Sequence, residues 1–188
     1  MRTALLILFS ALTLVGCDEN YVAKPRGYFR IALPERNYVS YDAPCNTTFD
    51  IPSFTKIEII NQSADSCWYN LYFPRYNARI HCTYLHTSGS LTPLIEDAYN
   101  FAFKHESKAN AIRRIEFKSD STSNFGMLYE LTGDVASPLQ FFISDSVSNF
   151  LRGSLYFNHR SNADSVQPVV DYFKSDIEHL MNTVRWAN

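Results

Sequence analysis

Apolar and polar residues alternate in a series of short segments along this chain, and only two segments have helical spacing. Alternation with a period of two predicts strands with one buried face, whereas apolar residues at every third or fourth position predict an amphipathic helix. Strands are expected at residues 49–51, 56–60, 67–73, 78–85, 111–118, 125–132, 137–144 and 151–158. Helices are expected at residues 91–106 and 166–184.

The order of these segments predicts the fold class. Short turns between successive strands favour antiparallel pairing, and the helices must bury their apolar stripes against the resulting sheet. Within the segment 67–73, the residues Tyr69, Leu71 and Phe73 share one face, which we expect to be buried. We therefore predict an α+β fold, in which an antiparallel β-sheet carries two amphipathic helices and is preceded by an extended arm.

The N-terminus carries a targeting signal. A basic start, Met1-Arg2, precedes the apolar run Ala4–Leu14, which is too short to span a bilayer as a mature helix and is typical of a secretory signal peptide. The small residue Gly16 directly before Cys17 matches a bacterial lipobox. It predicts cleavage before Cys17 and a diacylglycerol thioether there, with acyl chains such as palmitate; two or more chains anchor a protein stably. The alternative is an ordinary signal peptide with a chance cysteine.

The predicted organisation is a signal peptide at 1–16, a lipid-anchored tether or arm at 17–44, and a single α+β domain at 45–188. The stretch Pro25–Tyr38 of the arm interleaves arginines with aromatic residues, both of which are enriched at protein interfaces. This composition predicts a partner-binding element. A strap folded onto its own domain is an equally supported alternative. The residues assigned to partner binding are Arg26, Tyr28, Phe29 and Arg30.

Three cysteines follow Cys17, and an oxidising envelope favours one disulfide among them. Cys82 shares the alternation of Ile80 and Tyr84, so it is expected to face the core. Cys45 and Cys67 lie at boundaries between loops and strands, which favours the pair Cys45–Cys67. A cross-strand bridge between Cys67 and Cys82 is the main alternative.

Several classes of function have no support in the sequence. The net charge of −2 argues against nucleic acid as a partner, and the six glycines form no phosphate-binding loop. The five histidines are scattered, the cysteines have no metal-ligand spacing, and no G-x-S-x-G motif or other catalytic constellation occurs. We therefore expect a protein that is not an enzyme and that needs no cofactor and no metal.

Three segments resemble a known family: KPRGYFRIALPERNYVSYDAPC at 24–45, CWYNLYFPRYNARIHCTYL at 67–85 and ASPLQFFISDSVSNFLRGSLYFN at 136–158. In them the chain is similar to the GldD family of gliding motility lipoproteins of Bacteroidota, and the likeness runs from Cys17 to Trp186. It implies a non-enzymatic envelope lipoprotein required for gliding motility, with a role in assembly or structure of the gliding and type IX secretion machinery. It also supports the pair Cys45–Cys67 and marks Cys82 as a departure.

The resemblance further implies partners among other gliding and secretion envelope proteins, and a lipid anchor in the outer membrane facing the periplasm rather than in the inner membrane. Bacteroidota attach O-glycans at Asp-Ser/Thr pairs followed by an apolar residue or Thr, and three such sites occur, at Ser121, Ser146 and Ser165. Aspartate followed by serine is also common in turns and helix caps. The alternative function is a small-ligand or glycan-binding envelope lipoprotein.

Overall fold

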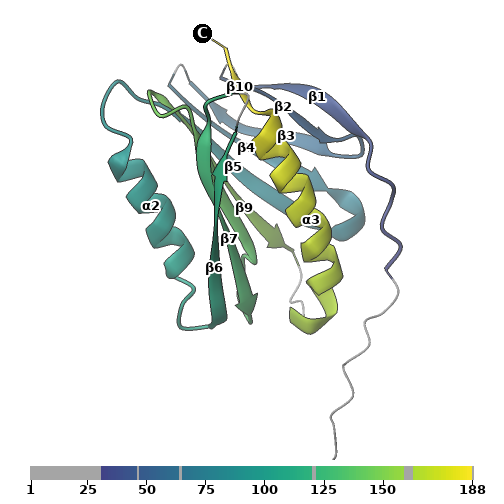
Figure 1. The fold of residues 1–188 in the computed structure, drawn as a ribbon. Helices are drawn as coiled ribbons and strands as arrows, with labels where there is room; N and C mark the ends of the chain where they lie inside the picture. Colours follow the sequence, from purple (N-terminus) through teal and green to yellow (C-terminus); the bar gives the residue numbers. More distant parts are fainter. Residues whose placement is uncertain (1–30, 46, 64, 120–121, 159–162, 188) are drawn as a thin grey trace, which may run out of the picture.

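Two antiparallel sheets form the framework of the protein in the computed structural model, which describes residues 31–187 apart from 46, 64, 120–121 and 159–162. Within these residues the larger sheet has seven strands and the smaller sheet has three (Figure 1). In spatial order the larger sheet contains β3 (Lys56–Gln62), β4 (Ser66–Phe73), β5 (Ala78–His86), β9 (Asn149–Phe157), β8 (Leu139–Ser144), β7 (Phe125–Gly133) and β6 (Ala109–Lys118). The smaller sheet contains β1 (Tyr38–Ala43), β2 (Thr47–Pro52) and β10 (Arg185–Trp186).

The other regular elements are helix α2 (Thr92–Phe103), helix α3 (Ala163–Thr183) and the 3-10 turn η1 (Pro74–Tyr76). The predicted α+β class is confirmed: the described chain contains two α-helices and two antiparallel sheets. None of the helices in the described part of the chain is both long and apolar enough to cross a membrane.

Strand β4 illustrates how an alternating segment becomes a strand. Tyr69, Leu71 and Phe73 are each 1% exposed, whereas Trp68, on the other face of the strand, is 47% exposed. Successive side chains of a strand point to opposite faces, so the three apolar residues share the face that lies in the main core, while Asn70 between them is buried on the other face. The predicted buried face of this segment is confirmed. The chain then turns into β5 through η1 and Asn77, whose φ of 46° is one that asparagine tolerates.

Strand β8 is buried on both faces, which shows where the two helices lie. Leu139, Phe141 and Ile143 belong to the main core together with α3, whereas Phe142 belongs to a second core together with α2. Because neighbouring residues of a strand face opposite sides, α2 and α3 cover opposite faces of the larger sheet (Figure 1).

Helix α3 packs against both sheets. It contacts β2 of the smaller sheet and β7 and β8 of the larger one. Its apolar stripe includes Val169, Phe173, Ile177 and Leu180, all 5% exposed or less. A stripe at spacings of three and four residues is what a helix needs to bury one side, and the predicted second helix is confirmed.

Two strands do not follow from the alternation of the sequence. Strand β1 lies within the segment 17–44 that the sequence assigns to the arm, and it pairs with β2 from Tyr38 opposite Pro52 to Ala43 opposite Thr47. Strand β10 has two residues, too few to show any period, and also pairs with β2. The indole N–H of Trp186 in β10 donates to Asn124 Oδ1 at 2.7 Å, which ties the C-terminal strand to the residue just before β7.

The cysteines link the two sheets. Cys45, in the turn between β1 and β2, forms a disulfide with Cys67 in β4, and their Cα atoms are 6.1 Å apart. Cys82 is a buried free thiol in β5, 2% exposed, so its predicted position facing the core is confirmed. Burial raises the pKa of the Cys82 thiol well above its usual value, because the thiolate would lose its hydration.

Candidate functional site

Most of the site residues predicted from the sequence lie outside the described residues. This holds for the lipidation residue Cys17, for the partner-binding residues Arg26, Tyr28, Phe29 and Arg30, and for the glycosylation candidate Ser121. Ser165 lies in α3, where only its backbone is described. The structure places the third glycosylation candidate, Ser146, in the turn between β8 and β9, where it is exposed and has a backbone φ of 68°.

The turn that contains Ser146 is organised by Asp145. The Asp145 Oδ1 atom accepts the backbone N–H groups of Val147, Ser148 and Asn149 at 2.8–3.0 Å. These bonds hold the turn, as aspartate does in many turns, and they give Asp145 a structural role. The neighbouring Ser146 has an exposed side chain, so its hydroxyl remains accessible to a modifying enzyme.

The described end of the N-terminal arm lies along α3, and we call residues 31–43 the strap. Ile31 packs against the main core, and the Tyr172 hydroxyl of α3 donates to the Pro34 carbonyl oxygen at 3.2 Å. Figure 1 shows the part of the strap before β1, residues 31–37, running beside α3 on the side of the molecule away from α2. This part of the arm is therefore folded onto its own domain.

A buried carboxylate holds the strap to α3. Asp176 of α3 is 3% exposed, and its Oδ1 atom accepts the Tyr38 hydroxyl at 2.8 Å and Arg36 Nε at 3.2 Å. Burial raises the pKa of Asp176, and the bonds from Tyr38 and Arg36 only partly offset this effect. Burial also raises the pKa of Tyr38, and so does its hydrogen bond to Asp176. The strap thus supplies partners that a carboxylate at this depth requires.

Aromatic contacts extend this attachment. The Arg36 guanidinium lies over the Tyr172 ring at 4.6 Å from its centre, a favourable placement for a cation. The Tyr38 ring stacks on the His179 ring with 3.8 Å between their centres. The Nε2 atom of His179 is also 3.3 Å from Asp50 Oδ2 of β2.

The sequence contains an overlooked signal for this site. Asp176 follows Phe173 by three residues and precedes Leu180 by four, so it occupies a position of the apolar stripe of the helix. A lone carboxylate on such a stripe is expected to need a buried partner, and the strap provides it.

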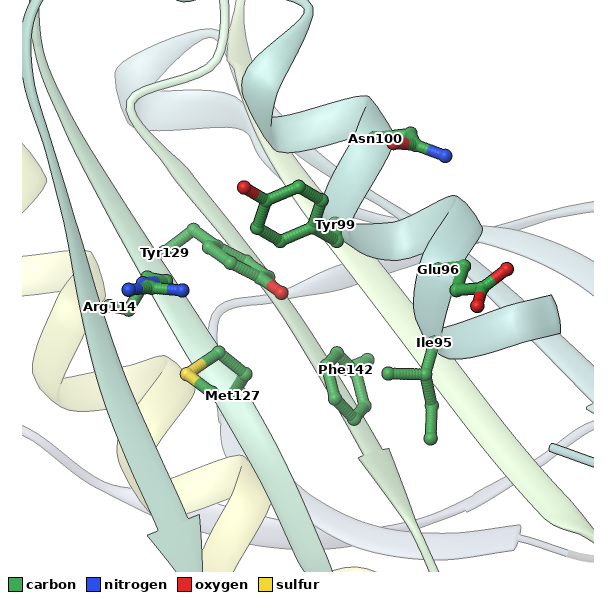
Figure 2. Close-up of a pocket in the computed structure, with 8 residues that line it drawn as sticks. All are labelled: Ile95, Glu96, Tyr99, Asn100, Arg114, Met127, Tyr129 and Phe142. Carbon is green, nitrogen blue, oxygen red and sulfur yellow. The ribbon is translucent and has the colours of Figure 1, made fainter. Parts of the chain in front are cut away.

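A groove separates α2 from the edge of the larger sheet formed by β6 and β7. One cavity of this groove has a volume of about 410 Å³. Figure 2 shows the eight residues that line it, which come from α2, β6, β7 and β8. They are Ile95, Glu96, Tyr99, Asn100, Arg114, Met127, Tyr129 and Phe142.

The orientation of the side chains gives the groove its chemistry. In Figure 2 the Tyr129 hydroxyl points into the cavity, Met127 and Phe142 lie on its sheet side, and Ile95 points from α2 toward Phe142. The polar ends of Glu96 and Asn100 point away from the sheet. The groove is therefore largely apolar.

A second cavity continues the groove along α2. It has a volume of about 510 Å³ and shares Ile95 with the first cavity. Phe125 and the turn residues Ser146 and Val147 line it, and Val147 is 74% exposed. The two cavities together form one elongated groove beside α2.

A row of polar residues crosses the face of the larger sheet that carries α2. Glu58, at the β3 end of the row, accepts two bonds from Arg79 at 2.9 and 3.0 Å and one from Asn70 at 3.1 Å, which lower the pKa of Glu58 to about 2. At the β6 end, Arg114 has no carboxylate within 4 Å among the described residues. From β3 to β6 the row is Glu58, Asn70, His81, Ser154, Gln140, Tyr129 and Arg114.

The described residues contain no group of three or more histidines, cysteines or carboxylates that could hold a metal ion. Their functional features are a strap bonded to α3 and a groove with an apolar floor and a cation. These features define an α+β domain with its N-terminal segment bound along one side and an open groove on the opposite face of the sheet.

The profile of a family described as gliding motility lipoprotein GldD matches residues 18–186, and the chain belongs to this family. Its members are lipoproteins, so the protein is associated with the cell envelope and has a role in gliding motility. The family resemblance stated from the three sequence segments is thereby confirmed. No curated protein matches the chain.

Proposed function

We propose that the protein is a non-enzymatic assembly or structural factor of the gliding and type IX secretion machinery, anchored through acyl chains on Cys17. In this role it holds a binding domain at the periplasmic face of the outer membrane. Its partners are other envelope proteins of the same machinery.

The attachment of the strap to α3 is the observation that carries this proposal. Arg36 and Tyr38 bind the buried Asp176, so the chain leaves the domain from a defined place beside α3. Only fourteen residue steps separate Ile31 from Cys17. A fully extended chain spans at most about 3.3–3.6 Å per residue, so these steps reach no more than roughly 50 Å. An acylated Cys17 would therefore keep the domain close to the membrane surface, as a component of a membrane-bound assembly needs.

In this proposal, the part of the arm between Cys17 and the strap contacts the partner proteins. The two arginines, Arg26 and Arg30, carry charges that can bind carboxylates. Tyr28 and Phe29 add aromatic contact area. Because the chain is held at both ends, at Cys17 and at the strap, this segment loses less freedom on binding than a free tail would.

Co-isolation of crosslinked envelope complexes tests the proposal. The variant Tyr28→Ala with Arg30→Ala is expected to lose the motility proteins recovered with the wild type and to glide poorly on agar, while its midpoint of thermal unfolding stays unchanged. The matched control is Tyr38→Phe, which weakens the strap and should lower the midpoint. Normal gliding and co-isolation by the double variant, or a large loss of its stability, would refute the proposed contact.

A further inference from the structure

We propose that the groove between α2 and β7 binds a free single-chain amphiphile with an alkyl chain and a carboxylate head. The chain lies along the apolar floor, and the carboxylate binds Arg114. This binding site goes beyond the assembly role and does not depend on it.

The shape of the groove matches an extended chain. Phe125, Met127 and Tyr129 line it from alternate positions of β7, and Ile95 of α2 borders both of its cavities. The rise of about 3.4 Å per residue in an antiparallel strand puts Phe125 and Tyr129 roughly 14 Å apart along the groove. This is the scale of a medium-length alkyl chain.

The floor of the groove favours an alkyl chain over an extended peptide. Between its ends the floor consists of Ile95, Met127 and Phe142, and β7 already pairs its backbone with β6 and β8. A peptide would bring N–H and C=O groups into this space with few partners, which is costly when they leave water. An alkyl chain carries no such groups.

Arg114 provides the charged end. It pairs with Tyr129 across β6 and β7, at the end of the groove opposite Phe125. Its neighbour Arg113 lies 3.7 Å from the carboxylate of Glu130, whereas Arg114 has no carboxylate that close among the residues the structure describes. A guanidinium binds a carboxylate through two parallel charge-assisted bonds. The nearby Glu96 directs its own carboxylate away from the sheet (Figure 2).

Photocrosslinking tests the site with the acylated mature protein in phosphatidylcholine nanodiscs. The probe is dodecanoate carrying a diazirine on its chain, used below its micelle-forming concentration, and the labelled peptides are mapped by mass spectrometry. Label is expected on peptides of α2 and β7, and unlabelled dodecanoate should compete it away. In Arg114→Gln, about ten times more unlabelled dodecanoate should be needed to compete the label away, because a charge-assisted contact is lost. The control Arg113→Gln should leave the competition unchanged, because consecutive residues of a strand face opposite sides.

A second variant, Ile95→Glu, puts a carboxylate in the middle of the groove and should abolish the label while circular dichroism shows a folded protein. Equal competition by dodecanol and dodecanoate would show that the head group is not recognised, and would overturn the assignment of Arg114. Label spread over the surface without competition, equal losses in Arg113→Gln and Arg114→Gln, or stronger competition by an apolar peptide would overturn the proposed ligand.

Discussion

The hydrogen bond from Tyr38 to Asp176 offers a sharp test of how the strap is held. Tyr38→Phe removes only the hydroxyl that donates to Asp176 Oδ1 at 2.8 Å and keeps the ring that stacks on His179. Asp176 is 3% exposed, so water cannot easily replace the lost donor.

The expected cost follows from the charge of the acceptor. A hydrogen bond to an ionised group contributes about 1.5–3 kcal/mol to stability. For a domain of this size, each kcal/mol shifts the midpoint of thermal unfolding by about 2–4 °C, so Tyr38→Phe should lower the midpoint by roughly 3–12 °C at pH 7. The matched control is Tyr41→Phe in the same strand, whose hydroxyl is not hydrogen-bonded within the described residues, and which should change the midpoint little.

The dependence on pH gives a second signature. Burial raises the folded-state pKa of Asp176, and the Tyr38 hydroxyl lowers it, so Tyr38→Phe raises this pKa further. An acid with a raised folded-state pKa costs stability above that pKa and ceases to do so once it is protonated. The loss in Tyr38→Phe should therefore be full at pH 7 and shrink as the pH falls through the pKa of Asp176.

The assay is thermal and urea unfolding of the mature protein by circular dichroism, at pH 7 and at mildly acidic pH. A loss of the same size at both pH values would show that the hydroxyl does not act through an ionised Asp176. No loss at pH 7, or an equal loss in Tyr41→Phe, would refute the attachment of the strap through this carboxylate.

Four further predictions concern other parts of the chain. Cys17→Ala should abolish acylation and release the protein from membranes; retention in the membrane pellet after a carbonate wash would refute this. Non-reducing peptide mapping should recover Cys45 joined to Cys67, a bridge that closes a 22-residue separation and contributes roughly 3 kcal/mol in the chain-entropy model, whereas three free thiols would contradict it. Gly153→Ala should cost about 1–3 kcal/mol in urea unfolding, because the added methyl would overlap a phenylalanine ring of β8, and an unchanged midpoint would show that the core can yield. The exposed Ser146 should carry an O-glycan in the native host, which intact mass would reveal; an unmodified polypeptide mass would exclude it.

The groove shows why the candidate site could not be assembled from the sequence. Helix 91–106 and strands 111–118 and 125–132 are each predictable from their own periods. The sequence of each segment taken alone does not predict that Ile95, Arg114 and Tyr129 line one cavity. That arrangement depends on the pairing register of β6 with β7 and on which face of the sheet α2 covers.

The faces of strand β8 also depend on the tertiary structure. Its six residues are all buried, so alternation alone cannot assign their faces. The packing of the two helices decides the face of each side chain. Phe141 lies in the main core with α3, and Phe142 lies in the second core with α2.

The sequence by itself determined the strands and helices with a clear period and the core-facing position of Cys82, and it predicts the lipoprotein signal, because each depends on neighbouring residues. Only the tertiary structure decided that the arm ends as strand β1, that its strap meets the buried Asp176, and that α2 leaves a groove beside β7. These features join residues far apart in the chain, and their free energy comes from burial and pairing that exist only after the sheets have formed.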